Sequence, residues 1–311
     1  MIYNTTSTMK NISIKYKKLK RVNNKIDKWD YLRYYFNEYL KQEYAPIKIQ
    51  RWWRKLSFKK KMYFKIKILR IFNDNVKGKK YEKSNKEHNG EEGHWLESQM
   101  GVKPNGKNEP DLYGHEMKKD SNVITFVDKT PSNINFEGDK IEYKNINKKI
   151  NKGKKLQFWN MFQRTNSSTK KIGGWKLDKW DVDGQCLHID ENNNIHVLYN
   201  YNNDERINKN DLVSDYYKNN TSHIIMSWDK IDIETAINNK WNKEGFFICK
   251  KNNDGIYNKI CFGDSITFNN WIQHVKEQNI YYDGYSSYDG RWRGCFRASK
   301  KWFNKHITEE Y

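Results

Sequence analysis

Residues 110–118 read PDLYGHEMK, a short stretch that carries two carboxylates and a lysine at fixed spacing. If residues 112–118 form a strand, its two-residue period places Glu116 and Lys118 on one face and Met117 on the other, toward a core. Asp111 follows a proline, which favours extended or turn backbone and suits a carboxylate at the entrance of a strand. The pattern predicts a surface on which acidic and basic groups meet.

Two neighbouring carboxylates can bind a hard divalent cation through oxygen, typically Mg2+ with several waters retained. Such a cation lowers the pKa of a bound water and stabilises charge on a phosphoryl oxygen, while a nearby lysine can orient the attacking water. Asp111, Glu116 and Lys118 therefore suit the hydrolysis of a phosphodiester. The alternative is a solvated strand edge whose alternating charges only prevent aggregation. The residues by themselves leave both interpretations open.

The segment ahead of the motif predicts a short helix. Trp95, Leu96 and Met100 form its apolar side, and Gly101 ends it, with Glu97 pointing elsewhere. After the motif, the polar residues 119–122 separate it from an apolar run over 123–127, which predicts a hairpin.

Three blocks around the motif carry a family resemblance: GxxLE (93–97), MGVKPN (100–105) and PDxxGxExK (110–118). Near the C-terminus, NIYYD (279–283) is followed by GRWRGCFR (290–297), a segment that ends in a Phe-Arg pair. Together these blocks resemble the MvaI/BcnI family of restriction endonucleases, which are PD-(D/E)xK nucleases related to the mismatch-repair nickase MutH. The resemblance covers residues 93–302.

The resemblance implies a mixed α+β fold with a restriction-endonuclease-like core. Asp111 and Glu116 would bind Mg2+, Lys118 would position the nucleophilic water, and Glu97 would support the site from its helix. The implied function is a sequence-specific DNA endonuclease that works as a monomer, nicks each strand in turn and has a companion DNA methyltransferase. The alternatives are a MutH-like repair nickase and a catalytically inactive DNA-binding or packaging protein.

The composition agrees with a polyanionic partner such as double-stranded DNA. The 311 residues contain 58 Lys and Arg against 38 Asp and Glu, a formal charge of +20. Part of this charge has a second explanation, because an AT-rich coding sequence also enriches lysine. The chain has no apolar run long enough for a membrane span and no signal peptide, which predicts a soluble, intracellular (cytoplasmic) protein. The four cysteines show no metal-binding spacing and predict reduced, buried thiols.

Residues 1–90 are predicted to form a basic helical extension and linker. Apolar periodicity predicts one helix over 18–44 and a second from about residue 46 to 69, followed by a polar linker over 76–92. Residues 49–59 resemble a calmodulin-binding IQ helix, but a calmodulin-like partner is not expected because many basic amphipathic helices match this pattern.

The nuclease is predicted to occupy residues 91–311, with its catalytic part over 91–180 and its DNA-recognition part over 181–311. The Asn- and Lys-rich segment 132–155 is either a loop lengthened by drift or a basic arm along a DNA backbone. Strands are predicted over 246–250 and 259–262, and a helix over 268–278, so the residues themselves also indicate mixed α and β structure.

The C-terminal block predicts DNA recognition. It interleaves Arg291, Arg293 and Arg297 with aromatic residues, and arginine can donate two parallel hydrogen bonds to a guanine edge. The alternative is a terminal hairpin packed by the aromatics, with arginines in surface ion pairs. His188 and His196 lie on a second predicted hairpin and could contact base edges or a metal, although histidines in strands more often have structural roles.

Overall fold

The computed structural model describes the backbone of residues 47–83, 90–102, 108–145, 152–162, 164–166, 169–286 and 292–311, and the side chains of 59–83, 90–102, 108–145, 153–162, 174–284 and 294–311. The chain divides into two compact units, residues 1–67 and 68–311. The helix predicted over 18–44 lies outside the described residues. The second predicted helix is confirmed as α3 (Ile47–Asn75), which contains the backbone of the calmodulin-binding-like segment.

The strands of the described chain form three sheets, which confirms the mixed α+β class. Sheet I has the order β1 (His115–Lys119), β10 (Gly245–Lys251), β11 (Tyr257–Gly263), β14 (Ile307–Glu310). Sheet II has the order β2 (Val123–Asp128), β13 (Trp292–Ser299), β12 (Ile280–Ser286), β6 (Thr169–Trp175), β5 (Arg164–Asn166). Sheet III has the order β4 (Asp139–Glu142), β3 (Asn133–Phe136), β9 (His223–Trp228), β8 (Ile195–Asp204), β7 (Asp183–Ile189).

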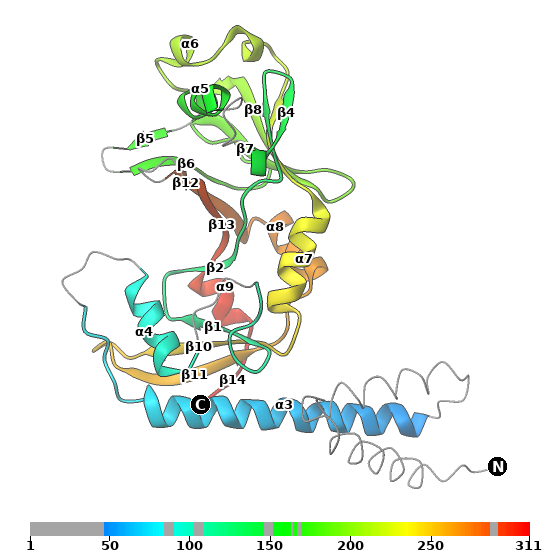
Figure 1. The fold of residues 1–311 in the computed structure, drawn as a ribbon, viewed down its shortest axis with the longest axis vertical. Helices are drawn as coiled ribbons and strands as arrows, with labels where there is room; N and C mark the ends of the chain where they lie inside the picture. Colours follow the sequence, from blue (N-terminus) through cyan, green and yellow to red (C-terminus); the bar gives the residue numbers. More distant parts are fainter. Residues whose placement is uncertain are drawn as a thin grey trace. The chain divides into compact units, whose positions relative to one another are not determined.

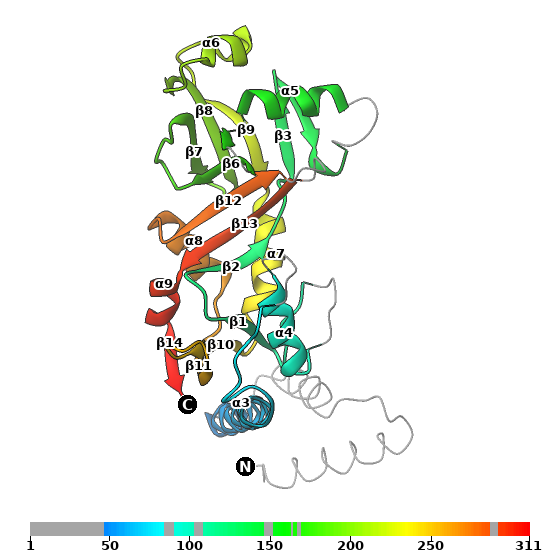
Figure 2. The ribbon, with the colours of Figure 1, turned by 90° about the vertical axis from the view of Figure 1, so that its left-hand side faces the viewer.

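Besides α3, the described helices are α4 (Glu91–Gln99), α5 (Lys152–Phe162), α6 (Lys209–Leu212), α7 (Lys230–Trp241), α8 (Phe268–Lys276) and α9 (Lys300–Lys305). Short 3-10 helices cover Tyr143–Asn145 and Asp215–Tyr217. Figures 1 and 2 show sheet II between sheets I and III, and α7 connecting β9 of sheet III to β10 of sheet I. The predicted strand pair β10–β11 and the predicted helix α8 are confirmed.

The prediction that the motif and the apolar run over 123–127 form a hairpin is wrong. β1 runs parallel to β10 in sheet I, whereas β2 runs antiparallel to β13 in sheet II. The polar residues between them are hydrogen-bonded to β10 and to α9: the amide of Asp120 donates to the carbonyl of Cys249, and the carbonyl of Asn122 accepts from the amide of Lys300. Local turn composition could not reveal this, because both partners of the two strands come from more than 120 residues further along the chain.

The end of α3 packs into a hydrophobic core beneath sheet I. Ile68, Phe72 and Val76 are buried with residues of α4 and of sheet I, including Leu96 and Met117. This agrees with the unit boundary after Lys67 rather than the expected boundary at residue 90. Residues 76–80 are also not a simple linker, because Gly78 donates to the carbonyl of Tyr257, whose amide donates to Lys79, and Lys80 bridges to Ile256.

The division expected at residue 180, between a catalytic and a DNA-recognition part, stays a prediction, and the sheets contain strands from both sides of it. Sheet I, which carries Glu116 and Lys118, is completed by strands from residues 245–310. The segment 132–155, expected to be a loop or arm, contains the β3–β4 hairpin and the start of α5. Residues 146–151 of that segment lie outside the described structure.

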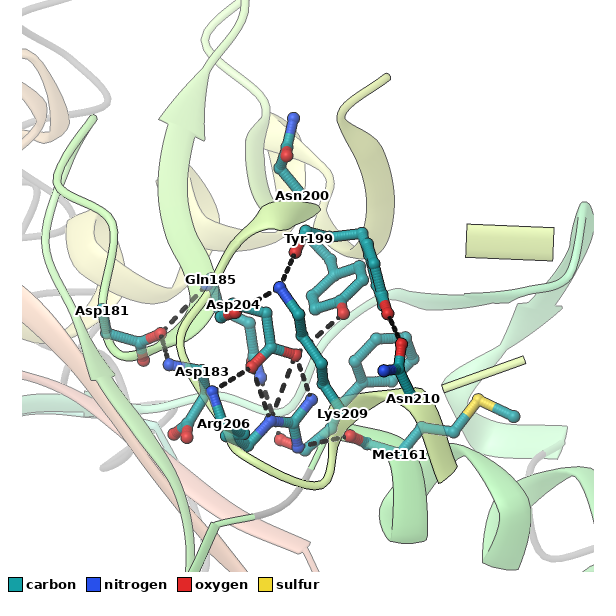
Figure 3. A network of polar contacts seen from close by, with 12 residues as sticks. Met161, Asp181, Asp183, Gln185, Tyr199, Asn200, Asp204, Arg206, Lys209 and Asn210 are labelled. Atoms are coloured by element: carbon teal, nitrogen blue, oxygen red, sulfur yellow. Dashed lines mark hydrogen bonds and ion pairs between the residues drawn. The ribbon is translucent and has the colours of Figure 1, made fainter. Parts of the chain in front are cut away.

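A buried polar network ties α5 to sheet III (Figure 3). The guanidinium of Arg206 donates to Asp204 (Nη2–Oδ2, 2.6 Å) and to the carbonyl of Met161 near the end of α5 (2.7 Å). Gln185 of β7 donates to the next carbonyl, that of Phe162, at 3.0 Å. Carbonyls at a helix C-terminus lack partners within the helix, so these two side chains cap α5. Asp204 and Arg206 therefore have a structural role, which is to hold the end of α5 against sheet III.

Two expectations from composition can be compared with the structure. The four cysteines, predicted as reduced thiols, are buried and unpaired: Cys186, Cys249, Cys261 and Cys295. Over the part of the chain that the structure describes, no helix is long and apolar enough to cross a membrane.

Candidate active site

A two-residue turn explains the spacing of the Asp111 and Glu116 carboxylates. Leu112 and His115 exchange two backbone hydrogen bonds of 3.0 and 2.9 Å, and the two residues between them have positive φ, 49° at Tyr113 and 81° at Gly114. Positive φ at both central positions defines the type I′ turn that closes tight hairpins, and glycine is favoured there. The residues flanking the Leu112–His115 pair, Asp111 and Glu116, therefore face each other across the turn.

The structure brings the two carboxylates and Lys118 together. The backbone amide of Met117 donates to Asp111 Oδ2 at 2.9 Å, and Lys118 Nζ lies 2.6 Å from Glu116 Oε1. Glu116 is only 1% exposed, and its Oε2 is buried without a hydrogen-bond donor among the described residues. Met117 points the other way, into the core beneath sheet I, as the strand period predicts.

The Asp111 and Glu116 carboxylates lie close together and are shielded from solvent, which changes the pKa values at the site. Burial and the neighbouring Glu116 charge raise the pKa of Asp111 from 3.8 to about 6, against the opposing effects of Lys118, the Met117 amide and Lys240. Burial of Lys118 opposes its charge, but the Glu116 carboxylate outweighs burial, so the pKa of Lys118 is raised. Asp111 and Asp128 add to this effect.

Two residues of the site were missed by sequence reasoning. Lys240 of α7 places its Nζ 3.1 Å from Glu116 Oε1, and the ring of Trp241 lies 5.4 Å from Lys118 Nζ. The sequence does contain a signal for Lys240. This lysine follows the buried Ala236 and Ile237 by four and three residues, which places it on the apolar face of a helix, where a charged residue needs a partner.

Glu97 is not joined to the other three predicted residues. It is half-buried on α4, and within the described residues its carboxylate has no hydrogen bond or ion pair with Asp111, Glu116 or Lys118. Its helix is nevertheless fixed to sheet I through Glu92. That carboxylate accepts hydrogen bonds from Lys251 at 2.7 Å, the Tyr257 hydroxyl at 2.9 Å and Lys119 at 3.3 Å.

The donor set at the hairpin fits a hard divalent cation. Asp111 and Glu116 offer carboxylate oxygens, and the buried Oε2 of Glu116 is an acceptor that lacks a donor in the described structure. The described residues contain no group of three or more His, Cys, Asp or Glu side chains arranged to hold a metal. Two carboxylates are sufficient for Mg2+, which usually keeps several of its waters.

The predicted DNA-recognition arginines lie on or next to β13. The β12–β13 hairpin of the alternative interpretation forms, with Arg293 opposite Tyr285, but Arg291 and the side chain of Arg293 lie outside the described residues. Arg297 is engaged within the protein: its guanidinium lies 3.2 Å from the Asp283 carboxylate and donates to Cys295 Sγ at 2.8 Å. These contacts favour the alternative interpretation, a structural ion pair, for Arg297.

The two predicted histidines face each other on sheet III. His188 of β7 is the register partner of His196 of β8, which confirms the predicted hairpin. Each ring has a carboxylate partner, Asp178 at 3.1 Å from His188 Nδ1 and Asp190 at 3.0 Å from His196 Nε2. The structure therefore places these histidines on a different sheet from Glu116 and satisfies one nitrogen of each ring.

Comparison with known proteins identifies the family. A family model described as LlaMI restriction endonuclease matches residues 73–308. The chain belongs to the LlaMI restriction endonuclease family. It is 30% identical over 275 residues to the type II restriction enzyme ScrFI of Lactococcus lactis subsp. cremoris, covering 79% of this chain and 97% of that enzyme. The expected relationship to MvaI/BcnI-type restriction endonucleases is thereby confirmed.

The fold of this family member is also found in a solved structure. The restriction endonuclease MvaI in complex with its cognate DNA substrate matches with a TM-score of 0.50 and 12% identity, over 81% of this chain and 97% of MvaI. This confirms the restriction-endonuclease-like fold. As a type II restriction endonuclease, the protein is a hydrolase that acts on DNA.

Proposed function

We propose that this restriction endonuclease cuts double-stranded DNA at a specific sequence with Mg2+, using residues 111–118 as a PD-(D/E)xK site. The observation that carries the proposal is the meeting of Asp111 and Glu116 across a two-residue turn, with Lys118 Nζ 2.6 Å from Glu116 Oε1. The buried Oε2 of Glu116, which has no donor within the described part of the chain, supports a cation there, because an unpaired buried carboxylate oxygen is costly.

Each residue then has a separate task. Asp111 and Glu116 hold the cation, which supplies positive charge to the phosphate and makes water easier to deprotonate. Lys118 orients the attacking water, whose oxygen bonds to phosphorus while one ester P–O bond breaks. The ring of Trp241, 5.4 Å from Lys118 Nζ, limits where that amine can move. Glu97 acts from α4 at longer range and supports the arrangement rather than holding the cation.

DNA recognition is assigned to the C-terminal hairpin. Arg291 and Arg293 are proposed to contact base edges, because Arg293 lies near the start of β13 and Arg291 comes just before that strand in the sequence. Arg297, His188 and His196 already have carboxylate partners. For these three residues we propose that each side chain contacts DNA while it keeps its carboxylate partner. Lysine-rich surfaces elsewhere would contact phosphates.

We further propose that the protein works as a monomer and nicks each strand in turn. The proposed site contains one such carboxylate pair, and a single site hydrolyses one phosphodiester at a time. Host DNA would then need protection by a companion methyltransferase of the same specificity.

Cleavage of plasmid DNA tests this function. Purified protein is incubated with unmethylated plasmid at low salt with Mg2+ or with EDTA, and the ends are sequenced. Discrete fragments that require Mg2+ and share one sequence are expected, with a nicked intermediate appearing first. Nicks that never become double-strand breaks would instead favour a MutH-like nickase, and salt-sensitive binding without breakage would favour an inactive DNA-binding protein.

The variant Asp111→Ala tests the site. Cleavage is expected to fall by at least about a hundredfold, because the cation loses one of its two protein ligands. Binding to the cognate duplex, measured by gel shift in EDTA, is expected to persist. The control is Glu109→Ala, an exposed carboxylate two residues away. Full Mg2+-dependent cleavage by Asp111→Ala would refute the assignment.

A further inference from the structure

Two lysines from different parts of the chain converge on one oxygen of Glu116. Lys118 of β1 lies 2.6 Å and Lys240 of α7 lies 3.1 Å from the same Oε1. Lys118 belongs to the motif, whereas Lys240 is 122 residues further along and has no role in it. Both Glu116 oxygens are buried without a well-aligned hydrogen bond in the described structure, and the ion pairs of Lys118 and Lys240 are both made to Oε1.

The fold holds Lys240 in this place. The neighbouring Trp241 is fully buried, and its indole nitrogen donates to the carbonyl of Phe126 at 2.8 Å. One turn earlier, the carbonyl of Ala236 accepts from the side chain of Asn108, which ties α7 to the segment ahead of the motif. With the helix end fixed and Ile237 buried, Lys240 extends toward sheet I rather than into solvent.

The four charged groups balance one another. The Asp111 and Glu116 carboxylates face the ammonium groups of Lys118 and Lys240, so the site without a cation is close to neutral. A buried carboxylate with a single partner would be strongly destabilised. Lys240 therefore supplies charge that a divalent cation would otherwise have to supply.

We propose that Lys240 is a positioning residue that occupies Oε1 of Glu116, leaves Oε2 for the cation and weakens cation binding through its positive charge. This inference rests on the proposed metal site. A weakened resting affinity would make cation binding depend more strongly on DNA, because DNA phosphates add negative charge beside the carboxylates. Lys240 would thereby limit loading of the site in the absence of substrate.

Titration calorimetry of Mg2+ and Mn2+ into the full-length protein without DNA tests the inference. Lys240→Met is expected to bind either cation about tenfold more tightly, because a positive charge has been removed from beside the site. Lys240→Arg keeps the charge and is expected to bind like the wild type. Lys230→Met is the matched control, since it removes an exposed lysine from the other end of the same helix.

A stability measurement provides a second readout. In EDTA, Lys240→Met is expected to melt several degrees below the wild type, and added Mn2+ is expected to restore more of its stability than in the wild type. Lys240→Gln retains a donor for Oε1 without the charge, so its affinity decides the question should the methionine variant fail to fold. Unchanged or weaker cation binding in the folded Lys240→Met or Lys240→Gln protein would overturn the inference.

The outcomes separate this inference from the proposed function. If the wild-type protein binds neither cation, or if Asp111→Asn binds as well as the wild type, the metal site itself is wrong. If the wild type binds, Asp111→Asn does not, and Lys240→Met and Lys240→Gln bind like the wild type, the metal site stands and the role of Lys240 is wrong.

Discussion

Asp111 is held in a place that disfavours its charge when no cation is bound. Its pKa rises from 3.8 to about 6, first because of burial and then because of Glu116. The folded state therefore binds this proton more tightly than the unfolded state does. For this group alone, the free energy of unfolding is highest below about pH 4 and falls as pH rises toward 6. Above pH 6 the destabilisation amounts to about 3 kcal/mol.

Asp111→Asn tests this cost at the residue scale. Asparagine keeps an oxygen for the Met117 amide but carries no charge. In EDTA the variant is expected to be more stable than the wild type at pH 8, by up to about 3 kcal/mol, and to differ little at pH 4. Urea unfolding at both pH values measures the difference. Glu109→Gln is the control, and an equal effect of Asp111→Asn at pH 4 and pH 8 would contradict the prediction.

At the scale of elements, one half-buried carboxylate, that of Glu92, ties α4 to sheet I. Glu92 joins the helix to β1, β10 and β11 through Lys119, Lys251 and Tyr257. Burial would raise the pKa of Glu92, but the hydrogen bonds from Lys251 and Tyr257 outweigh burial and lower it. The ionised form is thus the one that anchors α4, and with it Glu97, to the sheet of the candidate site.

Glu92→Gln removes this charge while preserving the shape of the side chain. We expect the free energy of unfolding to fall by about 1–3 kcal/mol, because Lys119 of β1 and Lys251 of β10 both lose their carboxylate partner. Chemical denaturation at pH 7 measures the loss. Glu234→Gln, which breaks an exposed i,i+4 pair with Lys230, should change stability by less than about 0.5 kcal/mol. A similar small change in Glu92→Gln would show that α4 is anchored by apolar packing alone.

At the scale of the whole molecule, the positive charge is unevenly divided between the two units. Residues 1–67 contain 19 Lys and Arg against 4 Asp and Glu, whereas the whole chain contains 58 against 38. The family match begins at residue 73, so most of the excess charge lies outside it. Such a segment suits contact with DNA phosphates, which carry no sequence information.

Replacement of Lys59, Lys60 and Lys61 by glutamine tests this role in the full-length protein. Affinity for cognate and non-cognate duplexes is expected to fall equally, and the slope of log K against log salt should decrease by up to about 3. The melting temperature should change little. Lys259→Gln, which alters a lysine paired with Glu310 on sheet I, is the control. A loss confined to the cognate duplex would instead assign these lysines to sequence recognition.

Features that depend on neighbouring residues could be predicted. Apolar spacing was sufficient for α4, α8 and the β7–β8 and β10–β11 pairs, because periodicity and turn composition act over a few residues. Asp111, Glu116 and Lys118 lie within eight residues of one another, so one tight turn brings them together. Their motif also carried the family resemblance.

Features that depend on residues far apart in the chain could not be predicted from the sequence. The strand partners of β1 and β2, the packing of residues 68–80 on sheet I and the position of Lys240 all require contacts between segments far apart in the chain. The sequence by itself determined the spacing of the two carboxylates and the lysine that the 111–118 hairpin carries, together with the family. The tertiary structure alone decided which sheet holds that hairpin and which second lysine meets Glu116, because burial of apolar surface selects among long-range pairings that local patterns leave equivalent.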